Sequence, residues 1–144
     1  MSRTGVVIVT HGDHGLEMLA AASAIVGEIP QVNVVPVTNT DKPELVHAKI
    51  RAAAASVDDG GGVLFAVDLH GSTPYRICDA FASAQVDAEI VSGLNLPMLI
   101  KLATCPRDSG PRALAELMKE TGRRSIQVGC DMPGHPPRSD AEKR

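Results

Sequence analysis

Short hydrophobic runs alternate along the chain with longer segments in which apolar residues recur every three or four positions. The uninterrupted runs at residues 5–9 and 63–67 are rich in β-branched residues and predict strands that are buried on both faces. Residues 32–37 and 88–91 predict two further strands. Because strands and helices alternate, we expect an α/β fold with a mostly parallel sheet of four strands and helices on both faces.

Glycine and proline mark the expected helix ends. The first helix is expected over residues 16–26, where Gly27 follows as a C-cap, and the second begins at Pro43 and continues for about four turns. We predict a short edge strand at residues 125–128, antiparallel to the rest of the sheet. The later helices are expected over about 74–84, from Pro97 onward and over 112–120.

The length and the hydrophobic pattern predict one domain. A chain of 144 residues is long enough to bury a core, and we assign residues 1–128 to this domain. Prolines and charged residues replace the hydrophobic pattern in residues 129–144, which we expect to form a flexible tail. The apolar run near the N-terminus is too short for a signal peptide or a membrane span, so we expect no direct membrane insertion.

Composition narrows the classes of function. The formal net charge is -3 and aromatic residues make up 2% of the chain, so it lacks the basic surface and the stacking rings that nucleic-acid binding uses. Cys78, Cys105 and Cys130 are odd in number and far apart, which argues against a disulfide framework and a zinc knuckle. We therefore expect a cytoplasmic protein that does not bind nucleic acid.

Three polar loops follow the predicted strands, at residues 10–15, 68–73 and 92–97. The carboxyl ends of parallel strands lie together, so these loops should meet at one edge of the sheet. Ligands of open α/β sheets bind at this edge. The candidate chemistry therefore comes from these three loops.

His11 is the candidate nucleophile, because it stands at the end of the first strand. A neutral imidazole can attack phosphorus once a hydrogen bond holds its other ring nitrogen and fixes the tautomer. Asp68 follows a central strand and can accept that hydrogen bond. Each residue alone could have a purely structural role, with His11 as a helix cap, but the two together favour phosphoryl transfer.

Hydroxyl groups and backbone amides near Gly71, Ser72 and Thr73 are suitable donors around a transferring phosphoryl group. The same Ser-Thr-Pro sequence is also typical of a helix start, so capping is a second role for these residues. His14 and His70 lie near the site, and we assign no direct role to either.

A metal cluster is the alternative interpretation of the histidines and carboxylates in these loops. His11, Asp13, His14, Asp68 and His70 carry groups that suit zinc, iron or cobalt. The spacing of His11 and His14 is weak evidence, because two rings at a junction of loop and helix need not converge. We therefore assign no metal ligand and expect no cofactor.

Three motifs resemble, in order, the enzyme IIA domain of the mannose, fructose and sorbose family of the bacterial phosphotransferase system. Residues 7–12 resemble its strand and phosphohistidine loop, 67–74 its aspartate loop, and 93–98 its G-x-N-x-P-M segment. Two positions depart from the family pattern. Ser72 replaces a common glycine, which would make a positive φ less easy there. Arg76 replaces a common asparagine and could contact phosphate or the phosphoryl donor.

What this resemblance implies is a phosphocarrier. His11 would be phosphorylated by the carrier HPr, with Asp68 orienting the ring and Thr73 donating a hydrogen bond to the phosphoryl group. The group would then pass to an enzyme IIB or act as a signal to a regulatory protein. The family is also dimeric, which implies a homodimer in which residues 125–128 join the partner's sheet. We expect further binding residues at Thr10, Gly12, Gly71, Ser72, Arg76 and Asn95.

Other functions stay open. The phosphocarrier subunit that feeds dihydroxyacetone kinase resembles the first strand and its histidine, although the G-x-N-x-P-M segment favours enzyme IIA. A small metal chelatase for tetrapyrroles also has a His-Gly loop, but it would need a second histidine late in the chain, where His135 lies in the predicted tail. A regulatory binding module would use the same phosphohistidine as a switch.

Overall fold

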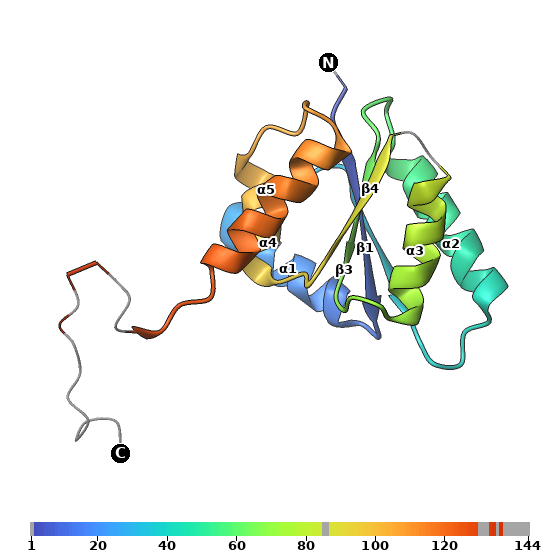
Figure 1. Ribbon diagram of the computed structural model, residues 1–144, viewed down its shortest axis with the longest axis horizontal. Coiled ribbons are helices and arrows are strands. Elements are labelled where there is room, and N and C mark those ends of the chain that lie inside the picture. The colour runs from blue at the N-terminus through green and yellow to red at the C-terminus, as the bar shows by residue number, and fades with distance from the viewer. Residues whose placement is uncertain (1, 85–86, 130–132, 135, 137–144) are drawn as a thin grey trace.

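The computed structural model describes residues 2–84, 87–129, 133–134 and 136. None of the helices in these ranges is long and apolar enough to cross a membrane. The elements follow the alternation that the sequence predicts (Figure 1). In chain order they are β1 (Gly5–His11), α1 (His14–Val26), β2 (Val32–Val37), α2 (Pro43–Val57), β3 (Val63–Val67), α3 (Thr73–Ser83), β4 (Ala88–Ser92), α4 (Leu96–Thr104) and α5 (Pro111–Arg124).

The sheet has the strand order β2-β1-β3-β4, and each pair of neighbouring strands is parallel. This confirms the four predicted strands. β1 and β3 lie in the centre and are buried along almost their whole length, as their uninterrupted apolar runs predict. Val9 of β1 pairs with Val67 of β3. The residues that follow this pair therefore emerge next to each other at the carboxyl edge of the sheet.

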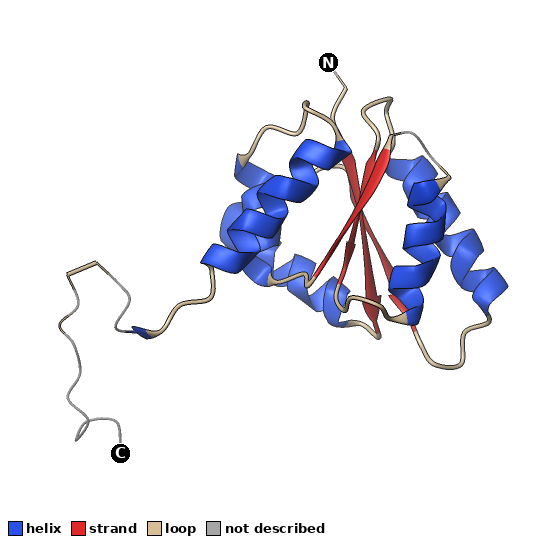
Figure 2. Ribbon diagram, viewed as in Figure 1, coloured by secondary structure: helices blue, strands red, loops and turns tan. Residues whose placement is uncertain are grey.

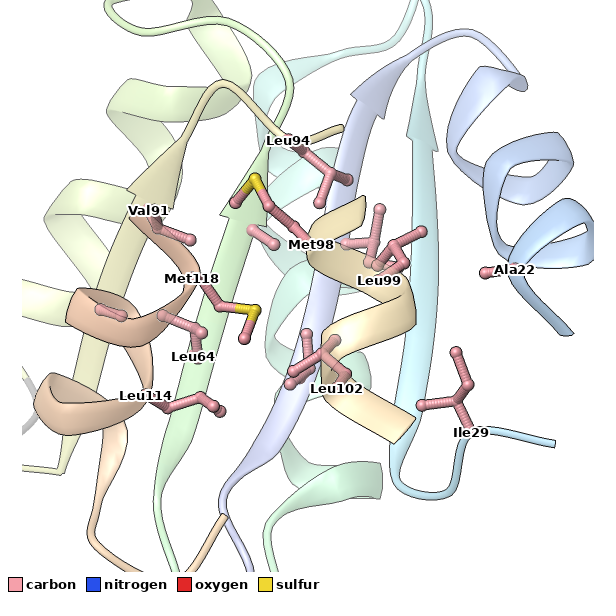
Figure 3. Close-up of a cluster of buried hydrophobic side chains, with 14 residues drawn as sticks. Ala22, Ile29, Leu64, Val91, Leu94, Met98, Leu99, Leu102, Leu114 and Met118 are labelled. Carbon is pink, nitrogen blue, oxygen red and sulfur yellow. The ribbon is translucent and has the colours of Figure 1, made fainter. Parts of the chain in front are cut away.

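Helices cover both faces of the sheet (Figures 1 and 2). α1, α4 and α5 lie on one face, and α2 and α3 lie on the other. Each face of the sheet has its own hydrophobic core, the first under α1, α4 and α5 and the second under α2 and α3. Successive side chains of β1 point to opposite faces, so Val6 and Ile8 belong to the first core and Val7 and Val9 to the second. Figure 3 shows the side chains that α4 and α5 contribute to the first core, Met98, Leu99, Leu102, Leu114 and Met118.

The chain beyond α5 differs from the expectation. Ser125 lies in a turn, and residues 126–128 carry no strand assignment in this single chain, where Ile126 is 81% exposed and Val128 65% exposed. Figure 1 shows this segment leading away from the helices. The edge strand, its exchange in a dimer and a domain boundary at residue 128 stay predictions. Most of the expected tail lies outside the described residues, and so do Cys130 and His135.

Candidate functional site

His11 and Asp68 meet at the carboxyl edge of the two central strands. His11 is the last residue of β1, and Asp68 directly follows β3. The Asp68 carboxylate accepts a hydrogen bond from the backbone N–H of His11 at 2.9 Å. The Nδ1 atom of the His11 ring lies 3.0 Å from Oδ2 and 3.2 Å from Oδ1 of the same carboxylate. The strand pairing therefore brings together the two residues that the sequence singled out.

The Asp68 carboxylate is stabilised in its ionised form. Partial burial raises its pKa, but hydrogen bonds from the backbone N–H and ring of His11 and from the ring of His14 outweigh this and lower the pKa below the ordinary value of 3.8. An ionised carboxylate can only accept hydrogen bonds. In the neutral imidazole of His11 the proton is therefore on Nδ1, which leaves the lone pair of Nε2 free on a side chain that is 44% exposed.

Thr10 holds the loop between β1 and α1 through hydrogen bonds of its side chain. This side chain is fully buried, and its hydroxyl accepts a hydrogen bond from the Gly15 N–H at 3.1 Å and donates one to the Gly12 carbonyl at 3.3 Å. Gly12 has a φ of 63°, and its N–H donates to the Val37 carbonyl of β2. The contacts of Thr10 and Gly12 thus fix the backbone on both sides of His11.

Gly15 allows this loop to close tightly. A Cβ atom at this position would lie 2.6 Å from the Thr10 hydroxyl oxygen and 2.9 Å from its methyl carbon. Any side chain there would push the first turn of α1 away from β1. The sequence offered no sign of this contact, because a glycine near a helix start is common for other reasons.

His14 is the site residue that the sequence left without a role. It is the first residue of α1, and its Nε2 atom lies 2.7 Å from Oδ2 of Asp68. Its side chain is 50% exposed. The spacing of three residues after His11 was the available signal, but spacing does not determine which way a ring at a helix start will point.

The loop between β3 and α3 leads into α3, which is the second helix, after α1, that begins at the site. Gly71 adopts a φ of 77°, whereas Ser72 has an ordinary extended conformation with a φ of -70°. The expected difficulty of a positive φ at Ser72 does not arise, because Ser72 has a negative φ and Gly71 makes the turn. Ser72 is the N-cap of α3: its hydroxyl accepts from the Tyr75 N–H at 3.3 Å and donates to the Leu69 carbonyl at 2.7 Å.

Thr73 and Arg76 lie in the first turn of α3, and both are exposed. Their side chains are thus open to a group brought by another protein. Asn95 is placed differently, as the N-cap of α4. Its amide oxygen accepts from the Met98 N–H at 3.3 Å, and its amide nitrogen donates to the Gly122 carbonyl at 3.5 Å. Asn95 therefore ties the start of α4 to the end of α5.

His70 lines a pocket of about 440 Å³ that Asn95, Lys119 and Arg123 also line. Its ring packs against the ring of Tyr75 at a centroid distance of 4.4 Å. The Nδ1 atom of His70 lies 3.3 Å from the Ser92 hydroxyl of β4. These contacts connect His70 to β4 and α3, and none of them involves the Asp68 carboxylate.

The metal interpretation gains no geometric support in the described part of the chain, where no three His, Cys, Asp or Glu side chains are grouped to hold a metal ion. His11 and His14 each direct one ring nitrogen at Asp68. The late histidine that a chelatase would need, His135, lies outside the described residues.

Comparison with known proteins identifies the family. The family model described as "EIIA-man: PTS system fructose IIA component" matches residues 5–120. The chain belongs to the EIIA-man family. This confirms the resemblance that the three motifs indicated. Membership of this family of IIA components supports a phosphocarrier role in a sugar phosphotransferase system. The dihydroxyacetone kinase and chelatase alternatives are not favoured.

Some relatives of this EIIA-man chain are much longer than the part that it matches. The mannose-specific EIIAB component of the phosphotransferase system of Escherichia coli K12 is 31% identical over 125 residues, which cover 85% of this chain but only 38% of that protein. The chain therefore spans well under half of this relative. The fructose-specific EIIA component of Bacillus subtilis strain 168 is 26% identical over 123 residues, which cover 85% of this chain and 84% of that protein.

Solved structures share the fold of the EIIA-man chain. The mannose/sorbose-specific IIA subunit from Enterococcus faecalis aligns with a TM-score of 0.80 and 27% identity, over 91% of this chain and 97% of the other. The component EIIA from Streptococcus agalactiae aligns with a TM-score of 0.75 and 21% identity, over 87% and 96% of the two chains. The four-stranded parallel sheet with its covering helices is thus the fold of known IIA proteins.

Proposed function

We propose that this EIIA-man chain accepts a phosphoryl group on Nε2 of His11 from phosphorylated HPr. The observation that supports the proposal most directly is the 3.0 Å contact between His11 Nδ1 and the Asp68 carboxylate. It holds the proton on Nδ1 and leaves Nε2 as the nucleophile, at a position that a partner protein can reach. The accepted group then passes to an enzyme IIB or serves as a signal to a regulatory protein.

The transfer balances without a base or a cofactor. The Nε2 lone pair of His11 forms the new bond to phosphorus, and the bond from phosphorus to the donor's ring nitrogen breaks, with its electron pair returning to the donor. No proton has to leave Nε2. The His11 ring gains positive character as the bond forms, and the ionised Asp68 stabilises it through the Nδ1–H hydrogen bond.

The phosphoryl oxygens need donors, which two helix starts supply. The backbone amides at the start of α1 follow His11 directly, and the dipole of that helix favours an anion there. Thr73 donates its exposed hydroxyl, and Arg76 adds a positive charge at the start of α3. Thr10, Gly12, Gly71, Ser72 and Asn95 act indirectly, because their observed contacts or conformations shape the loops at this edge of the sheet.

We also infer a cytoplasmic homodimer. HPr and an enzyme IIB are the partners that the family relationship supports, and HPr works in the cytoplasm. Ile126 and Val128 present apolar side chains to solvent beyond α5. An extended segment with apolar side chains gains backbone hydrogen bonds and burial by joining the sheet of a second copy.

The experiment is phosphoryl transfer from purified, phosphorylated HPr, followed by intact mass. We expect the chain to gain one acid-labile phosphoryl group and His11→Ala to gain none, with its fold retained because His11 is exposed. His47→Ala is the matched control, because His47 is an exposed histidine on α2. A wild-type chain that gains no mass, or a His11→Ala variant that is labelled normally, would contradict the proposal.

A chelator separates the carrier from the metal interpretation. Transfer should proceed in excess chelator once enzyme I, whose own reaction is expected to need magnesium, has been removed from the charged HPr. If charged HPr phosphorylated the chain only when a divalent ion was added, His11, Asp13 and His14 would have to be reconsidered as ligands.

A further inference from the structure

His14 makes the shortest contact with the Asp68 carboxylate. Its Nε2 atom lies 2.7 Å from Oδ2, compared with 2.9 Å for the backbone nitrogen of His11 and 3.0 Å for Nδ1 of the His11 ring. The carboxylate therefore receives donors from two elements, β1 and α1. The proposed phosphoryl transfer uses the two donors of His11 but assigns no role to the third donor, Nε2 of His14.

The shared carboxylate gives the two histidines opposite tautomers. Because Asp68 is ionised and can only accept, His14 carries its proton on Nε2, whereas His11 carries its proton on Nδ1. The free nitrogen of His14 is thus Nδ1 and that of His11 is Nε2. The two rings are chemically distinct, although both are bonded to the same group.

Stability of α1 does not account for this contact. His14 is the first residue of the helix, where the dipole favours acidic side chains over basic ones. Histidine is also an ordinary helix former rather than a preferred one. The position provides a third donor on Oδ2, and this donor comes from α1, whereas the other two belong to His11. The carboxylate is therefore held by a residue other than the one it orients.

We propose that His14 is a positioning residue for phosphoryl acceptance: its Nε2–H fixes the rotation of the Asp68 carboxylate, and this keeps His11 in the Nδ1–H tautomer. The inference rests on the proposed function of His11. Without His14, the carboxylate is held only by groups of His11 itself and can turn about its side-chain bonds. The His11 ring then exchanges between tautomers, and only one of them has Nε2 free for attack.

The test compares His14→Ala with His14→Gln. The Nε2 atom of a glutamine can occupy about the same place as Nε2 of histidine and can donate the same hydrogen bond, whereas alanine cannot. His47→Ala, on the exposed side of α2, controls for the loss of an imidazole elsewhere. Since His14 is half exposed, thermal unfolding should show all three variants folded.

The first measurement is the tautomer of His11 in the unphosphorylated protein, from long-range nitrogen–proton NMR correlations of the ring. We expect the Nδ1–H form in the wild type, in His14→Gln and in His47→Ala, and a mixture of tautomers in His14→Ala. The second measurement is the rate of transfer from phosphorylated HPr. We expect a loss of about tenfold in His14→Ala, the size of one charge-assisted hydrogen bond, and a rate within about threefold of wild type in His14→Gln.

The proposal is overturned if His14→Ala keeps the His11 tautomer of the wild type. It is also overturned if the glutamine variant is as defective as the alanine variant, because then the ring itself and not its donated hydrogen bond is required. The tautomer measurement needs no phosphoryl donor. If the wild type accepted no phosphoryl group from HPr, the proposed function would fail on its own, and the tautomers would still decide whether His14 positions Asp68.

Discussion

Asp68 links the two histidines of the site, and its charge state controls both. Its carboxylate accepts from the backbone of His11 and from the rings of His11 and His14. Its side chain is 10% exposed, whereas the side chains of His11 and His14 are 44% and 50% exposed. One carboxylate at the end of β3 therefore determines which nitrogen of each ring is free.

We predict that Asp68→Asn slows phosphoryl acceptance by about tenfold to a thousandfold. An amide forms a weaker hydrogen bond with the imidazole and cannot stabilise its positive charge. Single-turnover transfer from phosphorylated HPr measures the rate. Asp79→Asn is a suitable control, because Asp79 is an exposed acidic residue on α3. Equal rates in the wild type and Asp68→Asn would remove Asp68 from the mechanism.

Asp68 should also make stability depend on pH. Burial opposes its ionised form, but the hydrogen bonds from His11 and His14 outweigh burial, so its pKa in the folded protein is below 3.8. The stabilisation is therefore fully present above pH 3.8 and is lost as the pH falls through the lower folded pKa. We expect the difference in free energy of unfolding between wild type and Asp68→Asn to shrink from pH 6 to pH 3. Urea unfolding at both pH values measures this, and a constant difference would contradict it.

At the scale of elements, the site depends on how closely α1 approaches the end of β1. The Gly15 N–H donates to the buried Thr10 hydroxyl, and the absence of a Cβ at Gly15 makes this distance possible. The same contact determines how close His14 lies to the Asp68 carboxylate, because His14 directly precedes Gly15 in the first turn of α1. The packing of Gly15 on Thr10 thus affects the positions of both His11 and His14.

We predict that Gly15→Ala lowers the free energy of unfolding by about 1–3 kcal/mol, the usual cost of forcing a methyl group into a filled space. It should also slow phosphoryl acceptance, because the start of α1 moves relative to Asp68. Ala20→Gly is the matched control: it weakens the exposed side of the same helix by about 1 kcal/mol without touching the loop. If the two variants transferred at the same rate, the packing of Gly15 on Thr10 would be irrelevant to the site.

Helices and strands could be predicted from the sequence where they are buried on one face or on both faces. The short apolar runs predicted all four strands, and the ends of the first and third brought His11 and Asp68 to one edge. The exposed side of α1 was not readable, because the helix is apolar almost all round; Leu16 is 44% exposed and Ile25 63% exposed. The direction of the His14 ring was not readable either, since it depends on a contact across 54 residues.

At the scale of the whole molecule, the candidate site and a buried arginine lie at opposite edges of the sheet. The amino edge is held by Arg107, a buried arginine whose guanidinium donates to the carbonyls of Thr4, Pro30 and Gln31. The segment from residue 106 to 110 interrupts the helical pattern in the sequence, and nothing in that pattern distinguishes its arginine from an exposed one. The carboxyl edge is left with loops that can present His11 to a partner.

The predicted homodimer concerns the segment that leaves the helices after α5. In an extended strand, residues 126 and 128 point to the same side, and both are strongly exposed in the single chain. Joining a partner's sheet would bury these two apolar side chains and pair backbone groups along the edge. We therefore expect the wild type to sediment at about twice the mass of one chain at micromolar concentration.

Replacing both Ile126 and Val128 with Asp should shift this equilibrium to the monomer, because two charges would have to be buried against the partner. Gln127→Glu is the matched control: it adds one charge in the same segment, but on the opposite side of an extended strand, so the dimer should survive. Sedimentation equilibrium of the three proteins decides the matter. A monomeric wild type would contradict the dimer, and a dimer that tolerates both aspartates would place the interface elsewhere. His11 and Asp68 belong to the same chain, at the end of β1 and directly after β3. Phosphoryl transfer to a monomeric form would therefore show that the site is complete without a partner.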